Sequence, residues 1–258
     1  MEYIDVSDAR ERTGLRLVLT EGVPGPWSEA AKGIFHAKGL DYVAVRQQGG
    51  GSNAELQEWT GQSSAPVAIW NDDPPYTTSR GILWLAERLA PKPALMPEEP
   101  EARALFLGLC DEIHAEMGFG WCRRLVMFNV ILSALPPDDG GAKVLRRMAL
   151  KYGHSEEAVE IASARVLEIL GLLSRRLEEQ QAMGSRYLFG DSLSALDIYW
   201  ATFAALLSPL PPDVCPMPDY LRVMYTAREP EVLAALDPKL LAHRDRIYRE
   251  HLQFPLEF

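Results

Sequence analysis

The residues with the clearest chemical potential form a short turn near the N-terminus, Gly25-Pro26-Trp27-Ser28. They follow an apolar run, LRLVLT at residues 15–20, and begin a segment with helical periodicity. The first-turn N–H groups of a helix have no intrahelical acceptor, and with the helix dipole they favour an anion or a thiolate. Ser28 is the one hydroxyl of this turn and therefore the candidate for chemistry. An ordinary tight turn without a ligand is the alternative.

Two further hydroxyls, Thr78 and Ser79, stand at the predicted start of a second helix, TTSRGILWLAERLAP at residues 77–91. As caps they would satisfy first-turn N–H groups, and together with those groups they could hold a carboxylate. Pro66 precedes a short apolar run, VAIW. Proline is tolerated at the first residue of a strand, whereas a cis bond there would present the backbone of Ala65 to a ligand. Both interpretations stay open.

The elements that position these residues are three predicted strands and the helices between them. Apolar runs predict strands at residues 15–20, 41–46 and 65–70. The first two enclose a helix that begins at Pro26 and ends near Gly39, which can take a left-handed cap. This order predicts a β-α-β unit followed by a further strand and helix.

Beyond these strands the pattern is helical only, which predicts an α/β half followed by an all-α half. Four prolines within residues 90–100 form a stiff connector. We therefore predict an N-terminal domain at residues 1–90, a linker at 91–99 and an all-helical domain at 100–258. Within the helical half, Ser194 and Asp197 stand three apart before an apolar run, the spacing of a capping box, which indicates a role in folding.

Composition excludes several classes of function. A net charge of −10 over 258 residues argues against nucleic acid or an anionic membrane as partner. The three cysteines and five histidines show no metal-ligand spacing, and no P-loop, HExxH or GxSxG motif occurs, so we expect no metal and free, mostly buried thiols. The charged N-terminus and the absence of a bilayer-spanning apolar stretch predict a soluble, cytoplasmic protein.

From about residue 15 to 235, the order of these motifs resembles the cytosolic glutathione transferase superfamily, of a bacterial serine- or cysteine-class type. The resemblance implies a thioredoxin-like N-terminal domain that binds glutathione as co-substrate. It also implies an all-helical C-terminal domain that supplies most of a hydrophobic second-substrate pocket, and a homodimer.

Residue by residue, Pro66 resembles the family's cis-proline, with Ala65 offering backbone hydrogen bonds to the cysteinyl part of glutathione. Ser79 matches the serine that holds the γ-glutamyl carboxylate. Thr78 stands where an acidic residue or glutamine is more usual. The resemblance thus implies a glutathione site that lacks one ligand for the γ-glutamyl amine.

The main departure from the family lies at the first turn, where Gly25 stands in place of the usual hydroxyl or thiol before Pro26-Trp27. Gly25 and Trp27 remain predicted contacts of glutathione. A free thiol near pKa 8.5 is only a few per cent ionised at neutral pH, so an activating donor is needed. Ser28, the third helical residue, is the predicted activator and Thr20 the second choice. Bare helix N–H groups are the rival to Ser28 as the activating donor. The alternative role for Ser28 itself is a hydrogen bond within its own helix.

The second-substrate pocket is expected along the segment CDEIHAEMGFGWCRRL at residues 110–125, where Met117, Trp121 and Arg124 are the candidate lining residues. A Met/Trp stripe at helical spacing is also typical of plain core. The C-terminal LQFPLEF is expected to be a loose end, or else to fold over the pocket.

Two functions follow. The first is an enzyme that transfers the glutathione thiolate to a hydrophobic electrophilic small molecule. The second is a non-catalytic module of the same fold, used for binding or dimerisation, which the glycine at position 25 and the threonine at position 78 favour.

Overall fold

The computed structural model describes residues 1–136 and 140–258. The chain divides into two compact units, which we describe separately. The N-terminal unit consists of Met1–Met96, Pro211–Met217 and Ile247–Phe258, and the helical unit of Pro97–Leu210 and Pro218–Arg246. The domain boundaries predicted from the sequence stay predictions.

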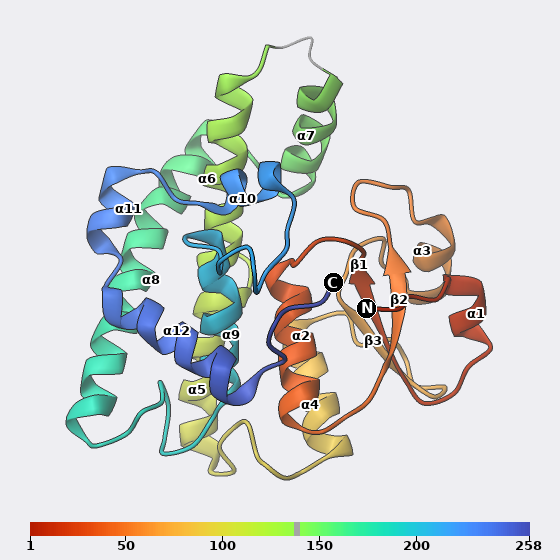
Figure 1. Cartoon of the computed structure of the whole chain (residues 1–258), viewed down its shortest axis with the longest axis horizontal. Helices are drawn as coiled ribbons and strands as arrows, with labels where there is room; N and C mark the ends of the chain where they lie inside the picture. Colours follow the sequence, from red (N-terminus) through yellow and green to blue (C-terminus); the bar gives the residue numbers. More distant parts are fainter. Residues whose placement is uncertain (137–139) are drawn as a thin grey trace. The chain divides into compact units, whose positions relative to one another are not determined.

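A three-stranded sheet organises the N-terminal unit, in the order β2-β1-β3 (Figure 1). Strand β1 (Leu15–Thr20) pairs in parallel with β2 (Val43–Gln47) and antiparallel with β3 (Val67–Trp70). Five of its six residues are buried, and four of these are Leu or Val, while the fifth is Arg16. The three strands predicted from apolar runs are confirmed, with β2 and β3 each beginning two residues later than expected.

Helices α2 (Pro26–Ala37) and α4 (Ser79–Leu89) pack against each other in this unit. Helix α2 ends as predicted, because Gly39 takes a φ of 63° and its N–H donates to the carbonyl of His36 at 3.0 Å. The side chain of Thr78 caps α4 by accepting the Gly81 N–H at 3.0 Å, which confirms its capping role. Both helices therefore begin at the turns that the sequence indicated.

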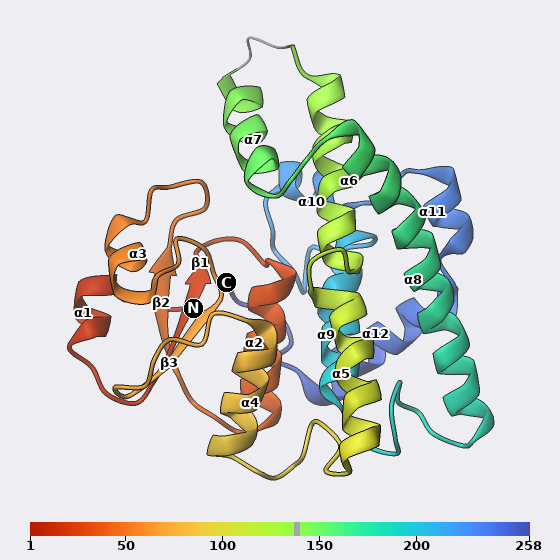
Figure 2. The ribbon, with the colours of Figure 1, turned by 180° about the vertical axis from the view of Figure 1, so that it is seen from behind.

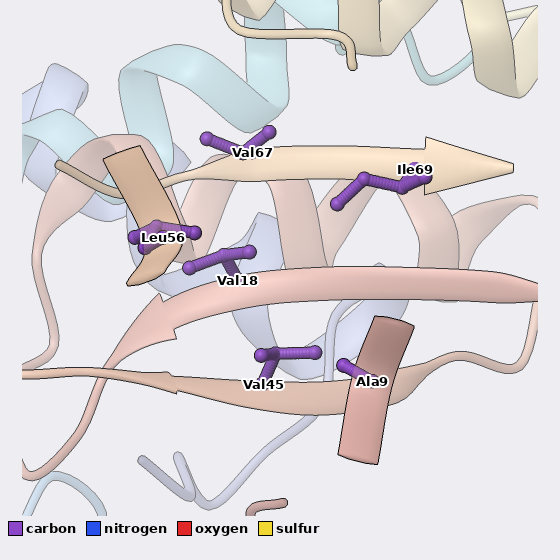
Figure 3. Packing of buried hydrophobic residues seen from close by; sticks show 6 residues of the cluster. All are labelled: Ala9, Val18, Val45, Leu56, Val67 and Ile69. Atoms are coloured by element: carbon purple, nitrogen blue, oxygen red, sulfur yellow. The ribbon is translucent and has the colours of Figure 1, made fainter. Parts of the chain in front are cut away.

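Short helices α1 (Val6–Arg10) and α3 (Ala54–Thr60) pack at the other side of the sheet, where a hydrophobic cluster joins them to all three strands (Figure 3). The cluster consists of Ala9, Val18, Val45, Leu56, Val67 and Ile69. Helix α1 was not predicted, and neither were two isolated bridges that widen the sheet, Ile4 with Val45 and Tyr76 with Ala68.

The helical unit contains the remaining helices (Figure 2). They are α5 (Pro100–His114), α6 (Phe119–Ala134), α7 (Gly140–Lys151), α8 (Glu156–Ala182), α9 (Ala195–Phe203) with the 3-10 turn η1 (Ala204–Leu206), α10 (Asp219–Tyr225), α11 (Pro230–Ala235) and α12 (Pro238–His251), whose last residues belong to the N-terminal unit. Across the described parts of the chain, no helix is both long enough and apolar enough to cross a bilayer.

A break between α5 and α6 interrupts the segment in which the sequence predicts Met117 and Trp121 on one helical face. Met117 has a φ of 61°, which is not helical, and α6 starts only at Phe119. A Cβ at Gly118 would lie 2.6 Å from the Asp111 carbonyl oxygen, so glycine is required for this close approach. The predicted helical stripe through Met117 and Trp121 is therefore wrong.

The core of the helical unit is built around α9. Trp200 is 0% exposed and donates its indole N–H to the Leu240 carbonyl at 2.9 Å. The predicted capping box is confirmed, with Asp197 Oδ2 accepting the Ser194 N–H at 2.9 Å. Asp197 is also 0% exposed, and its other carboxylate oxygen, Oδ1, lies 2.9 Å from Nε2 of His243. The three cysteines are free and buried, as predicted.

Candidate functional site

Strand pairing ties together the segments that carry the predicted binding residues. Val67, two residues after Ala65, pairs with Val18, and Thr20 is the last residue of β1. On the other side of β3, Tyr76 pairs with Ala68 through two backbone hydrogen bonds, and Ser79 follows Tyr76 by three residues as the first residue of α4. The segment that begins at Ala65 is therefore tied to β1 on one side and to the segment before α4 on the other.

The backbone at the start of this segment is available to a ligand. The Ala65–Pro66 bond is cis, as the resemblance implied. Within residues 1–136 and 140–258, neither the N–H nor the carbonyl of Ala65 has a hydrogen-bond partner in the chain. Ala65 is half-buried. Because backbone polar groups that lack partners are uncommon in folded proteins, this pair is a candidate for bonding a peptide-like ligand in the manner of a strand.

The start of α2 is the predicted anion-binding part of the site. Gly25 is the N-cap, in extended conformation at φ −65° and ψ 130°, and its carbonyl accepts the Glu29 N–H at 2.9 Å. This bond is the first of the intrahelical ladder, and Pro26 has no N–H of its own. The N–H groups of Trp27 and Ser28 thus precede the ladder, at the positive end of the helix dipole.

Ser28 is the third residue of α2, as predicted, but its side chain is only 4% exposed. Its hydroxyl therefore has little access to a ligand, although its N–H still lies in the first turn. Ser28 as the thiol activator stays a prediction. The helix N–H groups, the rival donor, require no side-chain access.

The second hydroxyl candidate, Thr20, is held within the structure. Its hydroxyl donates to Oε1 of Gln47 at 2.7 Å, and Nε2 of Gln47 donates to the Ser63 carbonyl at 3.2 Å. Gln47 thereby ties the ends of β1 and β2 to the loop before Pro66. Gln47 was not predicted. The available signal was its polar side chain at the end of a predicted apolar strand.

Thr78 and Ser79 lie at the start of α4. Thr78 is exposed and its hydroxyl oxygen is used in capping, while Ser79 is the first helical residue of α4 and half-buried. A carboxylate bound here would face the N-terminus of α4. Both residues stay predicted ligands.

A buried ion pair supports α2 from behind this turn. Nζ of Lys32 lies 3.0 and 3.1 Å from the two carboxylate oxygens of Glu29 and donates to the Glu257 carbonyl at 2.5 Å. Burial raises the pKa of Glu29, and the Lys32 ammonium opposes this shift. Leu256 is buried and its N–H donates to the Val214 carbonyl at 2.8 Å. The C-terminus is therefore packed within the N-terminal unit, and the expected loose end is wrong.

The second-substrate candidates belong to the helical unit, where two of the three come together. The Arg124 guanidinium carbon lies 4.2 Å from the ring centroid of Tyr152 and 6.0 Å from that of Trp121. The two rings meet edge to face at 5.5 Å. Burial lowers the pKa of Arg124. Met117 lies apart from α6 in the preceding turn, where its carbonyl accepts the thiol of Cys122 at 3.3 Å.

Comparison with known proteins shows which solved structures share this architecture. No family model matches the chain, and no curated protein matches it. A solved glutathione transferase family member from Pseudomonas fluorescens, with two glutathione bound, is similar at 15% identity and a TM-score of 0.63, with coverage of 95% of this chain and 94% of that one. The glutathione transferase from Methylobacterium radiotolerans in complex with glutathione sulfonate has 18% identity, a TM-score of 0.60 and 92% coverage of both chains.

The β-etherase LigF from Sphingobium is also similar, at 20% identity, a TM-score of 0.59 and coverage of 92% of this chain and 95% of that one. These likenesses extend over nearly the whole of both chains. The chain therefore has the glutathione transferase fold, a thioredoxin-like region followed by a helical remainder.

Proposed function

We propose that this protein binds glutathione at the sheet edge formed by Ala65, Ser79 and the start of α2, and transfers its thiolate to a hydrophobic electrophile. The observation that carries the proposal is the peptide group of Ala65, whose N–H and carbonyl have no partner among the described residues. Strand β3, which begins two residues after Ala65, pairs with β1 on one side and with Tyr76 on the other, which supports a site between Thr20 and Ser79. A tripeptide with a free carboxylate matches this set of donors and acceptors. Several similar structures contain bound glutathione, and another contains glutathione sulfonate, which supports the choice of ligand.

In this proposal each element has a separate role. Ala65 bonds the cysteinyl backbone, Ser79 and the α4 N-terminus hold the γ-glutamyl carboxylate, and Gly25 with Trp27 borders the sulfur. The first-turn N–H groups of α2 stabilise the thiolate, which a free thiol near pKa 8.5 does not form appreciably at neutral pH. Ser28 is the side-chain candidate for the same task.

We place the electrophile beside Trp121 and Arg124. Their aromatic and cationic surfaces favour an aromatic substrate that carries or develops negative charge. Met117 remains a proposed lining residue. Halides, epoxides and aryl ethers are possible electrophiles, and the resemblance in fold to a β-etherase makes an aryl ether a reasonable first substrate to assay.

We further propose that the protein is a cytoplasmic homodimer of the serine- or cysteine-class type. Exposed apolar side chains support an assembly, because Trp84 on α4 is 43% exposed and Leu105 on α5 is 56% exposed. Light scattering coupled to gel filtration tests the state, and a monomer at micromolar concentration would contradict it.

Glutathione titration by calorimetry tests the binding step, with the Ser79→Ala variant as probe. Loss of one hydrogen bond to a carboxylate, about 1.5–3 kcal/mol, is expected to weaken binding by about 10- to 100-fold. Ser7→Ala, which removes an exposed hydroxyl from α1, is the matched control and should bind as the wild type does. No saturable binding by the wild type would overturn the proposal.

The alternative is a non-catalytic binding module, which Gly25 favours because no hydroxyl stands at the N-cap of α2. The ultraviolet absorbance of the bound thiolate separates the two functions. A bound thiol that titrates at the pKa of free glutathione would support the module, whereas a pKa lowered by a unit or more supports the enzyme.

A further inference from the structure

A pocket within the helical unit is lined by none of the residues assigned to glutathione. It has a volume of about 290 Å³. The end of α8 and the following turn contribute Gln181, Ser185 and Arg186, and one face of α12 contributes Lys239, His243 and Arg246. The three α12 residues share that face because His243 follows Lys239 by four positions and Arg246 follows His243 by three.

The charge of this pocket contrasts with that of the protein. Arg186, Lys239 and Arg246 are cations, and none of the lining residues is acidic, whereas the chain as a whole carries −10. Lys239 forms an ion pair with Glu178 at 3.0 Å, in which both side chains are more than half exposed. Because such exposed pairs contribute little, Lys239 can turn to a bound anion at small cost.

His243 is held between two partners. Its Nδ1 lies 3.3 Å from Nη2 of Arg246, and its Nε2 lies 2.9 Å from a carboxylate oxygen of the buried Asp197. His243 therefore forms a fixed wall of the pocket.

Arg246 is held in place before any ligand arrives. Its guanidinium donates to the Arg186 carbonyl and stacks on the ring of Tyr187 at 4.9 Å from the centroid, in addition to its contact with His243. Fixing a long side chain in advance removes part of the entropy cost of binding. The pocket thus combines one pre-organised arginine with two exposed, adaptable cations.

We propose that this pocket binds a small molecule through a phosphate group. An arginine guanidinium can donate two parallel N–H bonds to two oxygens of a phosphate, and a lysine adds a point charge. Two arginines and a lysine therefore suit a phosphate dianion better than they suit a single carboxylate. The volume equals that of about ten water molecules at about 30 Å³ each, which leaves room for a substituent beyond the phosphate. A polymer such as nucleic acid is disfavoured because the cations are confined to one pocket of an acidic protein.

Calorimetric titration with inorganic phosphate at constant ionic strength tests this inference. The pocket variant is Arg186→Gln/Lys239→Gln, since both residues are exposed and leave Arg246 in place. The matched control, Arg175→Gln/Arg249→Gln, removes two exposed cations from the same two helices outside the pocket. Thermal unfolding in phosphate-free buffer verifies that both variants are folded.

We expect saturable phosphate binding by the wild type and the control, and at least tenfold weaker binding by the pocket variant. Absence of saturable binding by the wild type would overturn the inference, as would an equal loss in both variants, which indicates a general charge effect. Glutathione provides a second arm, since it carries carboxylates and no phosphate. If glutathione competes with phosphate at this pocket, the assignment to phosphate is wrong, while binding at the Ala65 edge is unaffected.

Discussion

Replacing Gly25 by serine should return a hydroxyl to the N-cap of α2, directly before the Pro26-Trp27 pair. The substitution is compatible with the backbone, because Gly25 has a φ of −65° and a ψ of 130°, an extended conformation open to any residue. A Cβ built at this position meets no atom within 4 Å. The change therefore tests chemistry without repacking the site.

The size of the effect follows from one added hydrogen bond to the thiolate. Serine can accept the Ser28 N–H as an ordinary cap while its hydroxyl proton points to the sulfur. A hydrogen bond to a charged group contributes about 1.5–3 kcal/mol, which corresponds to a fall of about one to two units in the thiol pKa. The largest rise applies to a wild-type thiol at the free value near 8.5, whose ionised fraction at pH 7 would go from about 3% to about 25–75%; the rise is smaller the more the α2 N–H groups already lower the wild-type pKa.

The assay is a pH titration of the ultraviolet thiolate absorbance of bound glutathione, paired with turnover of a chromogenic aryl halide. Turnover at neutral pH should rise in proportion to the ionised fraction, by at most about 8- to 25-fold. Gly25→Ala is the control, since it makes the same change in backbone freedom without the hydroxyl. Equal thiol pKa values in the serine and alanine variants would refute the position assigned to the sulfur.

Three other changes test the remaining features. Asp197→Ala should lower the free energy of unfolding by about 3–5 kcal/mol in urea, because it leaves the buried Ser194 N–H and His243 without their acceptor, whereas the exposed Asp191→Ala should have little effect. The pKa of Glu29 is raised in the folded state, so the folded protein keeps the Glu29 proton above about pH 4.3 and loses stability as the pH rises through the raised pKa. Glu29→Gln should lack this loss, which is measured by comparing urea unfolding at acidic and neutral pH. Ser28→Ala should leave the thiol pKa within about half a unit, since the side chain is buried, and a rise of a full unit would instead establish Ser28 as the activator.

The elements of the N-terminal unit could be predicted where the signal was local. The apolar run at 15–20, the proline that opens α2 and the glycine that closes it each act within a few residues. Helix α1 and the bridge at Ile4 could not be predicted in this way. Residues 1–14 carry too few apolar side chains for a periodic signal, and they gain their structure by packing against β2 and α3.

For the site, the sequence predicted candidate residues but not which groups are accessible. Ala65 and Ser79 were identified from their order along the chain, and their joint role in binding stays a prediction. The burial of Ser28 and the bridging role of Gln47 depend on neighbours from other elements, which leave no periodic trace in the sequence. The cationic pocket joins the end of α8 to α12 across more than fifty residues, so composition alone suggested only an acidic protein.

Trp200 provides an intrinsic optical reporter. An indole that is wholly enclosed, with its N–H bonded to a carbonyl, fluoresces at shorter wavelength than one in water, and Trp121 is the only other tryptophan of the helical unit. Trp84, 43% exposed in the N-terminal unit, emits at the longer-wavelength edge. In a Trp121→Phe background, the short-wavelength edge would be weighted to Trp200 and the long-wavelength edge to Trp84, with the half-buried Trp27, Trp59 and Trp70 of the N-terminal unit between them, and two distinct midpoints in urea at the two edges would show that the units unfold independently.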